Sequence, residues 1–156
     1  MRAMQVSHAM TAQALCCTSE TTLGAAATLM AAGKCGTLPV VHDGKTVGMI
    51  TDRDICLALA AAQCSPSELP VADVMSEVLY VCRDEDELEE ALETMTIHQV
   101  RRLPVLDQAG KLCGVLSIDD ILANAGDAGD GFLSYRDAVI AFQSICRRTE
   151  PSEGMI

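Results

Sequence analysis

The chain has 156 residues, 49% of them hydrophobic and 21% charged, which is enough apolar material for a packed core and argues against disorder. Its net charge of −11 argues against general binding to nucleic acids or anionic membranes, because both need a cationic surface. No apolar run approaches a membrane span and the N-terminus lacks the order of a signal peptide, so we expect a soluble, cytoplasmic protein.

The first half of the chain predicts a unit of the order β-α-β-β-α. Apolar residues in a predicted helix at 22–32 recur at i, i+3, i+4 and i+7, and Gly33 stands where a left-handed residue should end that helix. Thr51 stands at the expected N-cap of the last helix. The other expected elements are an extended segment at 15–18, a strand carrying Leu38-Pro39-Val40, a hairpin turn at Asp43-Gly44, a strand at 46–50 and a helix at 52–62.

The second half repeats the first about 65 residues later. Leu38-Pro39-Val40-Val41 returns as Leu103-Pro104-Val105-Leu106, and the segment 48–54 returns as 114–120. The expected elements are an extended segment at 78–82, a helix at 85–98, the second Leu-Pro-Val strand, a turn at 108–110, a strand at 112–116 and a helix at 118–125 capped by Ser117. A repeat implies one supersecondary unit used twice, and two facing copies would create two related clefts.

The sequence divides into repeat 1 at 1–64, a proline-containing linker at 65–70, repeat 2 at 71–125, and a Gly/Asp spacer with a C-terminal helix at 126–156. The two repeats are expected to form one module. Within the C-terminal region, Tyr135, Phe142 and Ile145 recur at helical spacing. This helix either docks on its own domain or presents a partner surface, since aromatic residues are favoured at interfaces.

The eight cysteines favour reduced and mostly buried thiols over disulfides. Free cysteine in an apolar run behaves as a small hydrophobe. Six cysteines lie mostly in such runs: Cys16, Cys17, Cys35, Cys56, Cys82 and Cys113. There is no CxxC pair and the three histidines stand at dissimilar repeat positions, so we predict no metal site, although one assembled in space from His and Cys stays open.

The doubled motif of Met-Thr/Ser, amphipathic helix, Leu-Pro-Val and Gly-h-h-Thr/Ser-x-x-Asp (h, hydrophobic) resembles the CBS domain, named after cystathionine β-synthase. The resemblance spans about residues 4–124 and is closest to small bacterial proteins that consist of little beyond a CBS pair. It implies an α+β fold of two pseudo-symmetric β-α-β-β-α repeats packed through their sheets, with a C-terminal helix added here. It also implies a homodimer, and clefts that bind AMP, ADP, ATP, S-adenosylmethionine or sometimes a dinucleotide.

The chemistry of the repeated Thr/Ser-x-x-Asp supports a nucleotide site. Asp54 and Asp120 lie in the first turn of their helices, where a carboxylate can accept hydrogen bonds from both hydroxyls of a ribose. The hydroxyls of Thr51 and Ser117, with nearby backbone N–H groups at a helix N-terminus, suit a phosphate. The alternative is that these residues are only an N-cap and an acid favoured by the helix dipole.

The two copies differ in charge, so we predict unequal sites. Arg101 and Arg102 replace Gly36-Thr37 of the first repeat, and Asp119 replaces Arg53. Arginine can clamp a phosphate through two hydrogen bonds, and we therefore predict that Arg53, Arg101 and Arg102 bind phosphate. The alternative is that these arginines pair with the abundant acids at the surface.

The resemblance also implies where the base should lie, against apolar residues near the first strand and the strand carrying proline. In this chain those positions are Cys17, Cys35, Cys82, Val100, Pro39 and Pro104. Cysteines here depart from the more usual Val or Ile of the family and leave a redox sensitivity open.

We therefore expect a regulatory sensor that binds an adenine nucleotide and signals to an unidentified protein, with no required cofactor. One alternative is a dimeric interaction module with vestigial clefts, and another is a metal- or redox-responsive protein. An enzyme is not expected, because no Ser-His-Asp or Cys-His arrangement, Walker-type loop or Gly-x-Gly-x-x-Gly occurs, and no residue is predicted to be catalytic.

Overall fold

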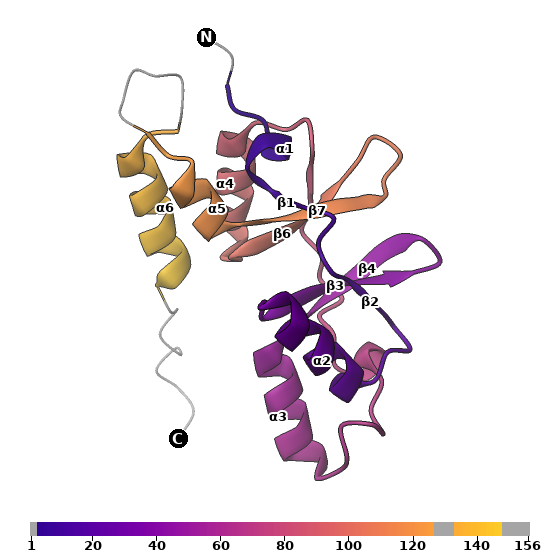
Figure 1. Cartoon of the computed structure of the whole chain (residues 1–156). Helices are drawn as coiled ribbons and strands as arrows, with labels where there is room; N and C mark the ends of the chain where they lie inside the picture. The colour runs from indigo at the N-terminus through magenta and orange to yellow at the C-terminus, as the bar shows by residue number, and fades with distance from the viewer. Residues whose placement is uncertain (1–2, 127–132, 148–156) are drawn as a thin grey trace.

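The computed structural model describes residues 3–126 and 133–147. Its first half contains α1 (Val6–Ala9), β1 (Thr11–Ala12), β2 (Cys17–Thr18), α2 (Leu23–Gly33), β3 (Thr37–His42), β4 (Lys45–Thr51) and α3 (Asp52–Ala62). Its second half contains the 3₁₀ turn η1 (Val71–Asp73), β5 (Cys82–Arg83), α4 (Leu88–His98), β6 (Arg102–Leu106), β7 (Leu112–Ser117), α5 (Ile118–Ala123) and α6 (Tyr135–Cys146). The predicted α+β fold, with two β-α-β-β-α repeats and a C-terminal helix, is confirmed (Figure 1).

The two sheets share one pairing pattern and exchange their opening segments. In each repeat the central strand, β3 or β6, pairs parallel with the short strand before it and antiparallel with its hairpin partner. The N-terminal strand β1 crosses over and pairs with β7, so that Thr11 lies opposite Val115. Ser76 forms the matching bridge with Met49 on β4. The segment that opens each repeat along the sequence therefore lies against the last strand of the other repeat.

Two glycines allow these crossing segments to lie close to the last strand of the other repeat. A Cβ on Gly48 would lie 2.6 Å from the carbonyl oxygen of Ser76, and one on Gly114 would lie 2.7 Å from that of Thr11. The methionine preceding each crossing strand also contacts the glycine, with Met75 Sδ at 3.0 Å and Met10 Sδ at 2.8 Å from the same Cβ positions. Because a backbone oxygen cannot move aside easily, both positions require glycine. The repeated Met-Thr/Ser and Gly-h-h motifs therefore form the same contact in both repeats, between a crossing segment and the glycine of the other repeat's hairpin.

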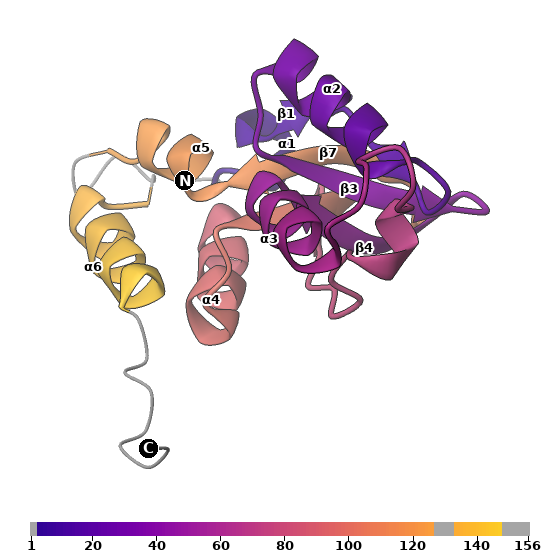
Figure 2. The ribbon, with the colours of Figure 1, turned by 90° about the horizontal axis from the view of Figure 1, so that it is seen from below.

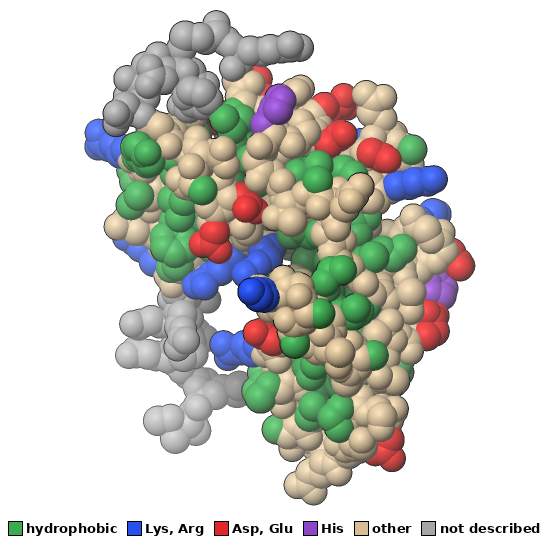
Figure 3. Space-filling view, viewed as in Figure 1, with side chains coloured by type: hydrophobic (Ala, Val, Ile, Leu, Met, Phe, Trp, Pro, Cys, Tyr) green, Lys and Arg blue, Asp and Glu red, His purple; other side chains and the backbone are tan. Residues whose placement is uncertain are grey.

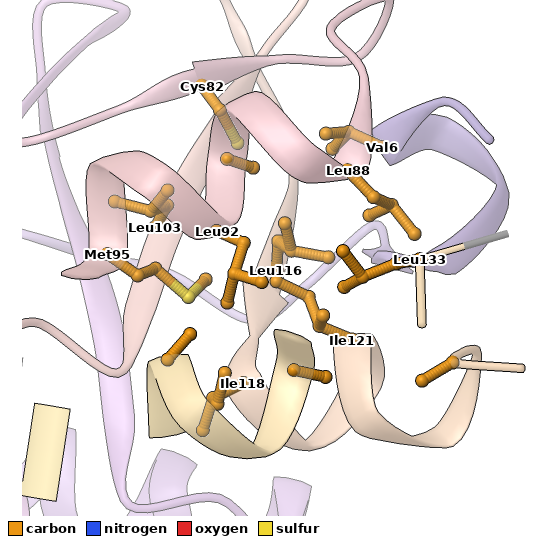
Figure 4. Packing of buried hydrophobic residues seen from close by; sticks show 14 of the residues in the cluster. Val6, Cys82, Leu88, Leu92, Met95, Leu103, Leu116, Ile118, Ile121 and Leu133 are labelled. Atoms are coloured by element: carbon orange, nitrogen blue, oxygen red, sulfur yellow. The ribbon is translucent and has the colours of Figure 1, made fainter. Parts of the chain in front are cut away.

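Each repeat has its own apolar core. On β3, Leu38 and Val40 are fully buried against α2, and on β6, Leu103 and Val105 are fully buried against α4. The crossing exchange reaches the cores too, since Val6 lies in the cluster of repeat 2 and Val71 in that of repeat 1. Figure 4 shows the larger cluster, where side chains of α4, β6, β7 and α5 point toward one another. The buried apolar surface of each repeat therefore depends on the presence of the other.

The C-terminal helix α6 docks on repeat 2. Ala138, Ala141 and Ile145 are buried in the core cluster of that repeat, and α6 contacts both α4 and α5. Figures 1 and 2 both show α6 beside these two helices. The opposite side of α6 exposes Tyr135, Val139 and Ile140. The interpretation that this helix packs on its own domain is confirmed.

Several predicted boundaries are wrong by a few residues. The left-handed residue after α2 is Lys34, with φ of 51°, while Gly33 is still helical. The predicted segments at 15–18 and 78–82 pair only at Cys17–Thr18 and Cys82–Arg83. Helix α4 begins at Leu88 instead of 85, because Asp86 Oδ2 accepts a hydrogen bond from Arg83 N–H over 2.7 Å and holds residues 83–86 in a turn.

The predicted Gly/Asp spacer lies outside the described residues from 127 onward; around its start, Ala125 is buried in the core of repeat 2 and Gly126 bridges to Ser134. Within the described ranges, no helix combines the length and the apolar character needed to cross a membrane.

Candidate nucleotide-binding clefts

Two clefts open between the repeats, and each is centred on the end of a hairpin. The first, which we call the Ser117 cleft, has a volume of about 270 Å³. Repeat 2 supplies Arg102, Val115, Ser117 and Asp120 to it. Repeat 1 supplies Thr11, Gln13, Ala14, Leu15, Gly33, Cys35 and Thr37.

The second, which we call the Thr51 cleft, has a volume of about 300 Å³. Repeat 1 supplies Thr37, Met49 and Thr51. Repeat 2 supplies Ser76, Val78, Tyr80, Val100, Arg101 and Arg102. Most positions of one lining have their repeat equivalent in the other, and Thr37 and Arg102 line both clefts, but Asp54, the equivalent of Asp120, does not line the Thr51 cleft. A molecule bound in either cleft would therefore contact both repeats.

A capping box occupies the hairpin end of each cleft. Asp54 Oδ2 accepts hydrogen bonds from the Thr51 hydroxyl over 2.7 Å and from Thr51 N–H over 2.9 Å. Asp120 Oδ2 accepts the same two bonds from Ser117 over 2.7 and 2.8 Å. Among the described residues, Oδ1 of either carboxylate has no hydrogen-bond donor. Oδ1 is thus the atom that could accept a hydroxyl of a ribose.

The capping box also limits what the hydroxyls can do. The single proton of Thr51 Oγ1 is donated to Asp54, and that of Ser117 Oγ to Asp120. A phosphate is an acceptor, so either hydroxyl could donate to it only after breaking the capping bond. The amides beside Thr51 are also occupied, since Asp52 N–H donates to the Gly36 carbonyl and Arg53 N–H to Asp52 Oδ1. Phosphate recognition at the Thr51 cleft would therefore rest mainly on arginine.

The arginines give the clefts different charges. The Thr51 cleft is lined by Arg101 and Arg102 with no carboxylate, whereas the Ser117 cleft combines Arg102 with Asp120. Arg53 is exposed on α3 and lines neither cleft. In the described part of the chain no arginine lies within ion-pair distance of a carboxylate; the two contacts of that kind there join the imidazole of His42 to Glu20 and Asp43. Figure 3 shows Lys and Arg side chains gathered at the waist between the two halves.

The predicted base-contacting residues divide into two groups. Cys35 lines the Ser117 cleft and Val100 lines the Thr51 cleft. The other predicted base contacts are buried in the cores or strands and line neither cleft: Cys17, Cys82, Pro39 and Pro104. Asp54 also lies just behind the lining, where it touches Thr51.

Sequence reasoning missed Leu15 and Tyr80, which occupy equivalent positions in the two clefts. Leu15 lies in the extended segment before β2, and Tyr80 lies in the extended segment before β5. The signal available was that Tyr80 is an aromatic residue in a chain that has only 3% aromatics.

The prediction of mostly buried thiols is wrong. All eight cysteines are unpaired, but only Cys17 and Cys82 are buried, while Cys16, Cys35, Cys56 and Cys146 are exposed. Burial raises the pKa of the Cys17 thiol to about 11 and that of Cys82 to about 12. Over residues 3–126 and 133–147, no three His, Cys, Asp or Glu side chains gather closely enough to hold a metal ion.

A model of the CBS domain family matches residues 6–61 and 71–127 of the sequence. The chain belongs to the CBS domain family. The two matched segments carry the hairpin ends and the crossing segments that form both clefts. The repeats are thus a tandem CBS pair.

The chain covers most of the length of several small relatives. The chain is 39% identical over 119 residues to the CBS domain-containing protein YhcV of Bacillus subtilis, covering 76% of this chain and 84% of that protein. The crystal structure of Hypoxic Response Protein I with two coordinated zinc ions has a TM-score of 0.71 and 31% identity, covering 79% of this chain and all of that one. The crystal structure of CBSX2 in complex with AMP has a TM-score of 0.64 and 28% identity, covering 76% and 93% of the two chains.

Proposed function

We propose that this CBS pair is a cytoplasmic regulatory module that binds an adenosyl ligand such as AMP, ADP or ATP in the clefts between its repeats. The observation that carries the proposal is that Arg102 lines both clefts beside a hairpin end whose aspartate (Asp120 within the lining, Asp54 directly behind Thr51) keeps one carboxylate oxygen free of protein donors. The complex of CBSX2 with AMP supports the ligand class. The eight unpaired cysteines fit a reducing compartment.

The ligand would lie across each cleft from carboxylate to apolar wall. In the Ser117 cleft the ribose hydroxyls donate to Oδ1 of Asp120, which is part of the lining; in the Thr51 cleft the equivalent Asp54 lies behind Thr51 and is reached past that residue. The phosphates accept from Arg102, joined by Arg101 in the Thr51 cleft. The base packs against the extended segment of the opposite repeat and against Cys35 or Val100. Catalysis is not proposed, because the hydroxyl–carboxylate pair at each hairpin end is accounted for as a helix capping box.

Signalling follows from the shared walls of the clefts. Because each cleft takes its lining from both repeats, a bound ligand stabilises one relative arrangement of the repeats over others. That arrangement is what a downstream protein would recognise.

Calorimetric titration of nucleotide-free protein with AMP, ADP, ATP, NAD and S-adenosylmethionine tests the ligand class. We expect Asp54→Ala and Asp120→Ala each to weaken one site. Asp137→Ala is the matched control, because Asp137 forms a similar cap with Ser134 on α6, away from both clefts. Failure of the whole panel to bind, or equal effects of all three variants, would contradict the proposal.

We also propose that two copies associate through α2 and α3. Helix α2 carries no charged residue, and neither does α3 between Ile55 and Ala62, yet Leu57 is 57% exposed. A groove of about 460 Å³ runs between the two helices, lined mostly by uncharged residues and also by Lys34 and Asp52. In repeat 2 the equivalent helices are covered by α6. A helix that is apolar on all sides is normally buried, and a two-fold axis lets the uncharged parts of two such faces cover each other.

Sedimentation of the wild type and two variants tests this interface. Leu57→Glu should give monomers, because it buries a charge between the two faces. Ile97→Glu is the control, since Ile97 is 65% exposed on α4, outside the proposed interface. A wild-type monomer, or a Leu57→Glu dimer as stable as wild type, would exclude the interface.

A further inference from the structure

Tyr80 lines the Thr51 cleft and is held by a second aromatic ring. Its ring stacks on the imidazole of His98, with ring centroids 3.7 Å apart and planes inclined by 14°. His98 is the last residue of α4, so the stack ties the extended segment that carries Tyr80 to the end of that helix. A ring supported in this way has a fixed orientation, and Val78 and Val100 continue the same apolar wall.

The Ser117 cleft has no such pair among the described residues. At the equivalent positions stand Leu15 and Gly33, and a Cβ on Gly33 would lie 2.5 Å from Leu15 Cδ1. The leucine therefore lies directly on the glycine. One cleft has a flat aromatic wall with a second ring behind it, and the other has an aliphatic wall.

We propose that Tyr80, supported by His98, is the stacking platform for the purine base in the Thr51 cleft, and that this cleft binds adenosyl ligands more tightly than the Ser117 cleft. The inference rests on the proposed function. A base that stacks on an aromatic side chain typically gains roughly tenfold or more in affinity. The two arginines of the same cleft also raise its affinity, since they attract the phosphates at the other end of the ligand.

Tyrosine fluorescence gives a site-specific readout. The chain contains two tyrosines and no tryptophan, so in a Tyr135→Phe variant Tyr80 is the single strong fluorophore. We expect AMP to quench that emission with a saturable curve that matches the tighter site seen by calorimetry.

Substitution of Tyr80 then measures the contribution of the stack. Tyr80→Leu, which copies the other cleft, should weaken the tighter site roughly tenfold, whereas Tyr80→Phe should retain it because the ring remains. Ile97→Ala, on the exposed surface of α4 beside His98, should bind as wild type, and thermal melting verifies that each variant is folded. If AMP binds and Tyr80→Leu leaves both sites unchanged, the stacking proposal is wrong and the proposed function stands. If the wild type binds no adenosyl ligand, both are wrong.

Discussion

Cys35 supplies a chemical probe inside one of the clefts. Its thiol is exposed and lines the Ser117 cleft, whereas Cys16 is exposed before β2 and lines neither cleft. We predict that saturating AMP slows iodoacetamide labelling of Cys35 several-fold and leaves Cys16 unchanged, because the ligand covers the first thiol only. Peptide mass spectrometry after timed labelling measures both rates. Equal rates at Cys35 with and without AMP would place the ligand elsewhere.

Cys82 predicts a loss of stability in alkaline solution. Burial, followed by the nearby charges of Asp86 and Cys113, raises the pKa of this thiol from 9.0 to about 12. Well below pH 9 the thiol is neutral in both the folded and the unfolded state, and its contribution to the free energy of unfolding is fully present. Between pH 9 and 12 the unfolded chain ionises first, so the free energy of unfolding falls, by roughly 1 kcal/mol at pH 10.

Urea unfolding at pH 7 and pH 10 measures this loss. Cys82→Ala should lose less stability than wild type over that interval, since it has no thiol to ionise. An identical loss of the free energy of unfolding in both proteins would show that ionisation of Cys82 does not cause the loss at pH 10.

At the scale of single elements, α6 offers a comparison within one helix. Ile145 is 7% exposed in the core of repeat 2, whereas Ile140 is 54% exposed on the opposite side. Ile145→Ala should lower the free energy of unfolding by about 2–4 kcal/mol, and Ile140→Ala by less than about 0.5 kcal/mol. Chemical denaturation measures both. Similar values for the two variants would mean that α6 is not docked as described.

Helix positions were predictable from sequence where a strong cap marks them. The Thr51 cap set the start of α3, and the predicted range 52–62 is the range observed. The start of α4 was not predictable in the same way, because 85–87 is acidic and helix-compatible but is held in a turn by Asp86. Cysteine burial also escaped prediction, because Cys16 and Cys35 lie outside the helices and strands and Cys56 lies on an exposed side of α3.

On the scale of the whole molecule, the exchange of opening segments joins the repeats into one structure. Gly48→Ala and Gly114→Ala should each destabilise the fold by about 1–3 kcal/mol, because the added methyl meets a backbone oxygen of the crossing segment. Gly24→Ala is the control, since its Cβ would meet Pro66 Cβ at 3.3 Å and alanine favours the helix it joins. Urea unfolding should show a single transition that shifts only for the first two variants. No shift for either would contradict the crossing contacts.

The repeat in the sequence predicted two clefts but not their composition. Because Arg101-Arg102 stands where the first repeat has Gly36-Thr37, the sequence indicated that the two clefts differ in charge. That Thr37 and Arg102 line both clefts depends on how the two hairpins meet. That relation is set by contacts between residues more than 60 positions apart, such as Thr11 with Val115, and no local pattern encodes it. For the same reason the sequence could not show that Arg53 lies outside both clefts.

Because Arg102 lines both clefts, its substitution tests directly whether both bind a nucleotide. Calorimetric titration of AMP into nucleotide-free protein should show two sites, and Arg102→Ala should weaken both by roughly tenfold or more, because each loses a charge-assisted hydrogen bond. Arg53→Ala, which changes an exposed arginine outside both linings, should bind as wild type. No binding of AMP by the wild type, or unchanged affinity at both sites of Arg102→Ala, would contradict the assignment of these clefts as nucleotide sites.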